Sequence, residues 1–174
     1  MYMGKFADLM RMTLDMSNKK QVSLEDEIKV LELYLQLEAL RFEEKFHYSI
    51  TLEKNIHPAD IHLPSMLIQP YVENAVKHGL LHIQTEKELT VVFDMDHNNV
   101  LTCTITDNGI GRKRSSEMND MRQKRYTSFA TGATQKRLEL LNHERTTAIA
   151  VTYDDLQDAN GNAAGTKVTL KIPV

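Results

Sequence analysis

Polar residues at helical spacing form a first candidate chemical cluster, which reads Glu-Asn-Ala-Val-Lys-His-Gly over residues 73–79. On a helix, Glu73 and Lys77 lie four positions apart and share a face, as do Asn74 and His78. A carboxylate, an amide and two potential cations along one helical edge can hold a hydrated metal, meet phosphates or orient a nucleophile. A surface helix with a single salt bridge is the plainer interpretation of the same residues.

Two glycine-containing clusters follow later in the chain. Asp-Asn-Gly-Ile-Gly over residues 107–111 comes directly after a predicted strand. A carboxylate at a strand end can accept the exocyclic amine of adenine, and Gly109 and Gly111 permit the backbone turns that bring a ligand close. Gly-Thr-Lys-Val over residues 165–168 enters the last predicted strand. Taken singly, the first of these is typical of a turn and the second of a hairpin.

Length and composition limit what can surround these clusters. The 174 residues fit one domain, or one domain with a helical extension. Lys plus Arg is 21 and Asp plus Glu is 24, for a net charge of −3, so nothing draws the whole chain to nucleic acid. The single cysteine, Cys103, excludes an internal disulfide and suits a reducing compartment. With no apolar run of ~18 residues and no signal-peptide pattern, we expect a cytoplasmic domain, alone or within a longer protein.

The first part of the chain has helical periodicity. One helix is predicted from Phe6 to Met16, and residues 18–20 break it. Ser23 and Asp26 then form a capping box that starts a second helix, which runs to about Phe42. This helix carries two apolar stripes, so it is covered on two sides, either within its own domain or by a helical hairpin or partner chain. The stripes are Leu24, Ile28, Leu31, Leu35, Ala39 and Phe42, and Val30, Leu33, Leu37 and Leu40.

After residue 45 the pattern mixes strands and helices. The alternation of apolar and polar residues over 46–52 predicts a strand, and prolines 58 and 64 bracket a loop. A helix that begins or kinks at Pro70 is expected to stop at Gly79. The remaining predicted elements are a hairpin of 89–95 with 100–106, a helix from about 132 to 143, and a hairpin of 148–153 with 166–172. This order predicts an α+β sandwich with one sheet and helices on one face.

In this order and spacing, the three clusters resemble the ATP-binding domain of gyrase, heat-shock chaperone ATPases, sensor histidine kinases and MutL, the Bergerat fold. More narrowly, the chain resembles the LytS/YehU-like bacterial sensor histidine kinases. Residues 63–79 are similar to the N box of that family almost position by position, and 22–28 and 34–42 look like its linker helix. The resemblance implies a helical linker or remnant of the dimerisation and phosphoacceptor region over 1–44, and over 45–174 an ATP-binding domain with a mixed sheet.

The resemblance also implies roles for the residues of the N box. Asn74 would coordinate Mg²⁺ beside the triphosphate of ATP. Glu73 would act as the polarising base for the accepting imidazole. Lys77 and His78 would meet phosphate oxygens.

The two glycine clusters have implied roles at the nucleotide base. Asp107 would bind the adenine amine, and Gly109 and Gly111 would shape the pocket wall. Thr166 would support the same adenine contact through water.

The segment after Gly111 resembles the mobile ATP lid of the family. It extends from Arg112 to Phe129, and we expect a charged loop here. Its residues 112–125 hold six basic residues against two acidic ones, which suits a triphosphate and places Arg112 among the ATP-binding residues.

One departure from the family pattern concerns its second glycine box. An alignment on Arg137-Leu138 puts Ser128, Ala130 and Ala133 where the family has two glycines and an asparagine. Without the glycines, backbone amides approach phosphates less closely, so nucleotide affinity is open. This leaves two alternatives to a histidine kinase: a degenerate nucleotide-binding or protein-interaction module, and an anti-sigma-like serine kinase or ATPase.

The second departure is the acceptor histidine, because none of the seven histidines stands in the first predicted helix. We therefore expect a fragment of a longer membrane-anchored kinase that binds ATP but does not phosphorylate itself. The resemblance implies as partners the phosphoacceptor helix of the same or a partner protomer, a response regulator and a second copy in a homodimer, but no nucleic acid.

Overall fold

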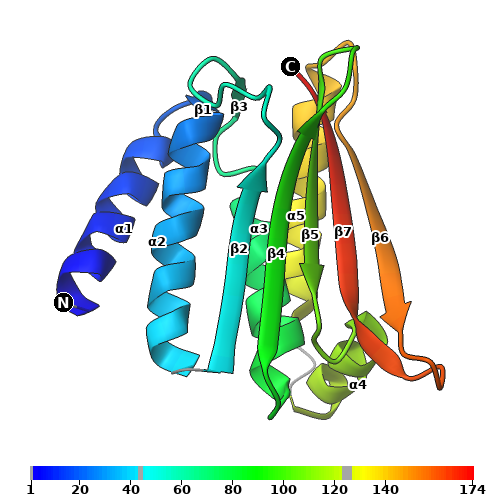
Figure 1. Ribbon diagram of the computed structural model, residues 1–174. Coiled ribbons are helices and arrows are strands. Elements are labelled where there is room, and N and C mark those ends of the chain that lie inside the picture. Colours follow the sequence, from blue (N-terminus) through cyan, green and yellow to red (C-terminus); the bar gives the residue numbers. More distant parts are fainter. Residues whose placement is uncertain (1, 43–44, 123–126) are drawn as a thin grey trace.

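A five-stranded mixed sheet with helices on one face forms the body of the molecule (Figure 1). The computed structural model describes residues 2–42, 45–122 and 127–174. The strand order is β2-β4-β5-β7-β6, in which β2 and β4 are parallel and the other pairs antiparallel. The strands are β2 (Phe46–Leu52), β4 (Lys87–Met95), β5 (Val100–Asp107), β6 (Ala150–Gln157) and β7 (Ala163–Pro173). The predicted α+β sandwich and both predicted hairpins are confirmed.

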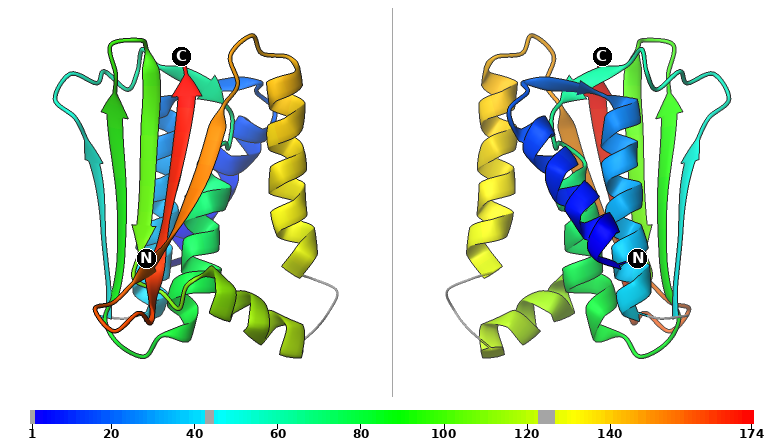
Figure 2. Two further views of the ribbon diagram at one scale, coloured as in Figure 1. Left: turned by 90° about the vertical axis from the view of Figure 1, so that its right-hand side faces the viewer. Right: turned by 90° about the vertical axis from the view of Figure 1, so that its left-hand side faces the viewer.

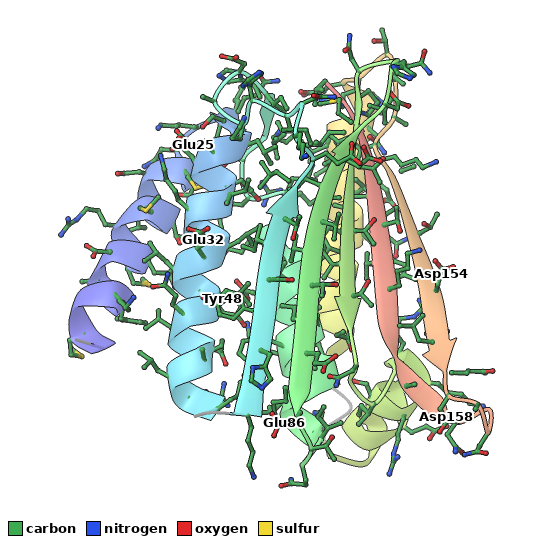
Figure 3. The ribbon with its side chains drawn as sticks, viewed as in Figure 1. Glu25, Glu32, Tyr48, Glu86, Asp154 and Asp158 are labelled. Atoms are coloured by element: carbon green, nitrogen blue, oxygen red, sulfur yellow. The ribbon has the colours of Figure 1, made fainter. Side chains whose placement is uncertain are left out.

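Strict alternation of buried and exposed residues explains why one face of the sheet carries the helices. On β4, Leu89, Val91 and Phe93 point into the core, and the residues between them are exposed. Successive side chains of a strand point to opposite faces, so this pattern gives one apolar and one polar face. Figure 2 shows the helices gathered on the apolar side, and Figure 3 labels Asp154, an exposed residue of β6 on the other side.

The two N-terminal helices form a hairpin beside the β2 edge of the sheet. They are α1 (Tyr2–Ser17) and α2 (Leu24–Phe42), close to the predicted bounds. The predicted cap is present, because the Asp26 N–H donates to Ser23 Oγ over 3.1 Å. The first stripe of α2 packs into the main core, and Val30 of the second stripe packs with Met16 and Val22. Both sides of the helix thus find cover within this chain, except at Leu40 of the second stripe, which is 51% exposed. The domain boundary at 44/45 stays a prediction.

The helix of the N box has three consecutive geometries. It is α-helical in α3 (Gln69–Asn74), π-helical over Ala75–Gly79 and 3₁₀-helical over Leu80–His82. Pro70 stands in the first turn, as expected, where its missing N–H leaves no bond unmade. The expected stop at Gly79 is wrong, because Gly79 keeps a right-handed conformation with φ −93° and the helix continues.

The expected charged loop after Gly111 is also wrong. Helix α4 (Arg112–Arg122) occupies its first half, and α5 (Thr127–His143) begins five residues before the predicted start at 132. Low apolar content indicates exposure rather than an absence of helix, since Arg, Lys, Glu and Met are strong helix formers. Figure 2 shows α4 projecting away from the sheet and α5 standing beside it.

A two-stranded ladder escaped prediction. Strand β1 (Gln21–Ser23) pairs with β3 (His62–Pro64), and three residues are too few to show a period. This ladder joins the start of α2 to the segment that precedes α3. Within the described residues, no helix combines the length and the apolar character needed to cross a bilayer.

Replacing Ser23 by Ala tests the cap of α2. The Asp26 N–H would lose its side-chain acceptor, so the free energy of unfolding should fall by ~1 kcal/mol. Urea unfolding followed by circular dichroism measures this change. The control is Ser17→Ala, whose hydroxyl bonds only to a carbonyl of its own exposed helix end and which should leave stability within ~0.5 kcal/mol. Equal losses in the two variants would contradict the capping role.

Candidate functional site

Three adjacent strands bring polar side chains to one end of the apolar face. The inward positions of β5 are Leu101, Cys103 and Ile105, and the next inward position is Asp107. Asp107 pairs in register with Thr166 of β7, and Thr166 pairs with Asp155 of β6. Directly paired residues share a face of the sheet. The three therefore form one row at the lower end of the sheet in Figure 1.

Asp107 is a buried carboxyl group at the centre of this row, with 4% of its surface exposed. Its Oδ1 accepts the N–H of Gly109 over 2.8 Å. Burial raises the pKa of Asp107 to about 6, and bonds from the backbones of Gly109 and Thr166 limit the rise. A carboxylate offers about four acceptor positions, so two backbone donors leave room for a further N–H donor such as an exocyclic amine.

The N box meets Asp107 through glycine. A Cβ on Gly79 would lie 2.7 Å from Asp107 Oδ1, and a Cβ on Gly109 would lie 2.4 Å from the backbone of Gly79. The N–H of Ile110 also donates to the Gly79 carbonyl over 3.3 Å. The end of the N box and the turn after β5 are therefore in backbone contact, which explains Gly79 better than the helix stop expected from the sequence.

The turn after β5 is held on both sides. Gly111 has φ +76°, a left-handed conformation that favours glycine, and its carbonyl accepts the Ser115 N–H in the first turn of α4. Asn108 bonds sideways to β4, accepting the Glu88 N–H over 2.8 Å and donating to the Glu86 carbonyl over 3.0 Å. Figure 3 labels Glu86 at this end of the sheet. The side-chain bonds of Asn108 to the backbone of residues 86 and 88 were not predicted from the sequence, although an Asn-Gly pair is a signal for such a turn.

Glu73 is bound at both oxygens by residues of its own helix face. Gln69 Nε2 donates to Oε1 over 2.9 Å, and Lys77 Nζ donates to Oε2 over 2.5 Å. The predicted pair of Glu73 and Lys77 is thus present, and Gln69 extends it by one turn. Asn74 is half-buried, and none of the described residues hydrogen-bonds its side-chain amide. Its role as a metal ligand stays a prediction.

His78 differs in charge from the cation expected at its position. It is half-buried, and burial lowers its pKa, with neighbouring Lys77 and His82 adding to the decrease. A His with a pKa below its ordinary value is neutral near pH 7. It offers a ligand an N–H donor rather than a full charge.

Arg112 anchors the first turn of α4 to the edge strand β6. Its guanidinium makes two bonds to the Asp155 carboxylate, of 2.8 and 2.9 Å, and lies 4.8 Å from the centre of the Tyr153 ring. The Arg112 side chain lowers the pKa of Asp155. In the structure Arg112 therefore links α4 to β6, and its contact with a phosphate stays a prediction.

The sequence clusters, far apart along the chain, meet in space. The π-helical segment that carries Lys77 and His78 contacts β5, β7 and α4. Asp107, Gly109 and Thr166 therefore face the end of the N box, with Arg112 at the adjoining helix. In the described part of the chain, no three His, Cys, Asp or Glu side chains gather to hold a metal ion. A cation here would need ligands from a bound partner such as a polyphosphate, which is how Mg²⁺ often binds.

Comparison with known proteins finds similarity to the proteins that the motifs resemble. Residues 1–46 match the family model described as histidine kinase. The Sensor protein LytS of Staphylococcus haemolyticus is 33% identical over 109 residues, which cover 62% of this chain and 18% of that protein. This chain is related in sequence to the LytS sensor proteins. The predicted resemblance is confirmed, and the chain spans about a fifth of the length of these curated relatives.

Solved structures agree on the fold. The histidine kinase domain of the Erythrobacter litoralis EL346 blue-light activated histidine kinase matches with a TM-score of 0.58 at 10% identity, covering 99% of this chain and 75% of that one. Histidine kinase ThkA, solved in complex with response regulator protein TrrA, matches with a TM-score of 0.56 at 9% identity, covering 98% of this chain and 48% of that one. Identities this low establish the fold, which is that of histidine kinase catalytic domains.

Replacing Asp107 by Asn tests the burial of its charge. The folded pKa is about 6 against 3.8 for the ordinary group, so between these values the folded state keeps a proton that the unfolded chain has lost. The contribution of Asp107 to stability therefore declines as the pH rises through this window, by up to ~3 kcal/mol, and is constant above it. Asn does not ionise, so Asp107→Asn should gain stability relative to the parent chain from pH 4 to pH 7.

Urea unfolding at pH 4, 5, 6 and 7 measures this relative gain. Asp60→Asn, a change at an exposed loop residue, is the control and should keep the pH profile of the parent chain. A difference between Asp107→Asn and the parent chain that stays constant with pH would contradict the burial of a charge at this position.

Adding a methyl group to Gly79 tests the contact between the N box and Asp107. In Gly79→Ala, the new Cβ would lie 2.7 Å from Asp107 Oδ1, so the carboxylate or the helix must move, at a cost of ~1–3 kcal/mol. Gly132→Ala is the matched control: Gly132 lies in α5 with nothing within 4 Å of an added Cβ, and Ala favours helix there by up to ~1 kcal/mol. Thermal unfolding should shift down in the first variant and not in the second.

Proposed function

We propose that this chain is the catalytic, ATP-binding domain of a two-component sensor histidine kinase, and that it transfers the γ-phosphoryl group of ATP to a histidine outside this chain. A response regulator would then receive the phosphoryl group. The observation that carries the proposal is the buried Asp107 carboxylate, which stands at the end of β5 in contact with the last turn of the N box.

The residues at this end of the sheet fit ATP chemically. Asp107 has acceptor positions left for the adenine amine, and Thr166 is its cross-strand neighbour. The two glycines in contact, Gly79 and Gly109, keep side chains away from Asp107. Asn74 supplies one oxygen for Mg²⁺, which suits an ion that takes few protein ligands when phosphates supply the others. When bound, Mg²⁺ neutralises charge on the triphosphate.

Glu73 and Lys77 divide the remaining chemistry between them. One imidazole nitrogen of the acceptor attacks the γ-phosphorus, and the bond to the bridging oxygen breaks with its electron pair leaving on ADP. The Glu73 carboxylate holds the proton on the other ring nitrogen, which raises the nucleophilicity of the attacking one. Lys77 Nζ donates to Glu73 Oε2 in the structure. If the Lys77 ammonium bound a phosphate oxygen instead, Oε2 would be free to accept the N–H of the imidazole.

Trans-phosphorylation tests this proposal. A polypeptide that carries the acceptor histidine helix is mixed with this chain and labelled Mg-ATP, and transfer is followed as acid-labile phosphohistidine. Glu73→Gln should lower the rate of transfer ~10²-fold at unchanged ATP affinity, and Asn74→Ala should abolish labelling. Asp60→Asn, a change at an exposed loop residue that is not one of the site residues, is the control and should label normally. Equal labelling by Glu73→Gln and the parent chain would sink the assignment of the base.

A second candidate function rests on α5. Residues 128–133, which align with the second glycine box of the family, lie within this helix. Amides beyond the first turn of a helix donate to its own carbonyls, so the later part of this segment has no free N–H groups for a phosphate, and only its first-turn amides remain available. This favours a nucleotide domain that acts through protein contacts, and calorimetry decides between the two, since that module gives no heat with Mg-ATP.

A further inference from the structure

The start of the N-box helix is held by a buried carboxylate from another helix. Glu27 of α2 has 1% of its surface exposed. Its Oε2 accepts the N–H of Met66 over 3.0 Å, and its Oε1 accepts those of Ile68 and Gln69 over 2.9 and 3.4 Å. The donors belong to the turn that leads into α3, so a single side chain of α2 binds the backbone from which the N box begins.

Two further bonds bring α1 and α5 to the same place. The Ser65 hydroxyl, also buried, donates over 2.6 Å to the carbonyl of Met16 near the end of α1. The Ser65 carbonyl in turn accepts a bond from Arg137 of α5. We call Glu27, Ser65, the N–H groups of residues 66, 68 and 69, and Arg137 the polar junction. It joins both N-terminal helices, the start of the N box and the helix that follows the lid segment.

Burying the Glu27 carboxylate costs free energy of folding unless hydrogen bonds compensate the charge. Burial raises the pKa of Glu27, and the three backbone bonds and the charge of Arg137 oppose that rise. Three N–H groups aimed at one carboxylate satisfy donors that would otherwise be buried without partners. Loss of the carboxylate would therefore release the turn without opening the apolar core beside it.

The N box connects the polar junction to the candidate active site as one continuous helix. It leaves the junction at Gln69, carries Glu73 and Asn74 one turn later, and reaches Asp107 at Gly79. In Figure 1 this helix runs behind the sheet toward the lower end, where the site lies. A shift of its first turn is carried along a rigid element to the catalytic side chains, and misplacement by ~1 Å can cost ~10²-fold in rate.

We propose that Glu27 is a positioning residue for phosphoryl transfer: it fixes the start of the N box to α2, so that Glu73 and Asn74 face the acceptor and the metal. The polar junction is then the place where movement of the N-terminal helices reaches the N box and, through Arg137, α5. This regulation rests on the function proposed above, but the anchoring by Glu27 has a readout of its own.

Hydrogen exchange measures the anchoring without any activity. In Glu27→Gln, the amides of residues 66–69 should exchange at least ~10-fold faster, while those of β4 and β5 keep their protection. Glu32→Gln is the matched control, because Glu32 is an exposed acid on the same helix (Figure 3). Faster exchange over the whole sheet, or unchanged exchange at residues 66–69, overturns the proposal.

Trans-phosphorylation then tests the positioning role. Glu27→Gln should lower kcat at least ~10-fold while the Kd for adenosine, which has no phosphates, stays within ~2-fold, because Asp107 stands on the sheet and not on the released helix. Glu27→Asp, which keeps the charge, should recover part of kcat and serves if Glu27→Gln does not fold. Equal losses in kcat and adenosine affinity indicate a general structural role and overturn the proposal. If the parent chain transfers no phosphoryl group, the proposed function fails, and the exchange result still decides the anchoring.

Discussion

The contact between the buried Asp107 carboxylate and Gly79 at the end of the N-box helix fixes how the other residues of the candidate site are placed. Asp107 stands where the apolar row of β5 ends, and Gly79 and Gly109 bring two backbones together beside it. The carboxylate is kept at a position where its charge costs stability, which its two backbone donors only partly offset. Such a cost is typical of residues retained for a ligand rather than for the fold.

The N box is held at both ends by polar contacts from different layers. At its start the carboxylate of Glu27 binds the backbone, and at its end the Gly79 carbonyl accepts the Ile110 N–H from the turn after β5. Between these ends Gln69, Glu73 and Lys77 bind one another along one face. The catalytic candidates therefore sit on an element whose position depends on the N-terminal helices and on the sheet together. This arrangement allows regulation from one side and nucleotide binding from the other.

Local patterns predicted most of the fold but fewer of the contacts. Alternation in β4 and β5 and the capping box at Ser23 depend on neighbours in sequence, and both were predicted correctly. The role of Gly79 was not predicted correctly, because glycine is expected both at a helix stop and at a close backbone approach to Asp107. The partners of Glu27 and Arg112 lie about 40 residues away along the chain, at separations of 41 and 43 for the closest bonds. The basic character of its segment marked Arg112 as a phosphate ligand, and no pattern singled out Glu27, because local patterns carry no information about distant partners.

Near residue 45 the hydrophobic periodicity changes from helical to strand-like. This change locates the end of α2, but it does not locate the end of a folding unit. Leu24, Ile28 and Leu31 of α2 share one core with the sheet, and Glu27, on the same turn, binds the N box. If α2 were removed at that point, the core would lose an apolar wall and three backbone donors would lose their acceptor. We therefore expect residues 45–174 to need α2 in order to fold. The helix that resembles the linker of sensor kinases is then a structural component of the domain that it is expected to control.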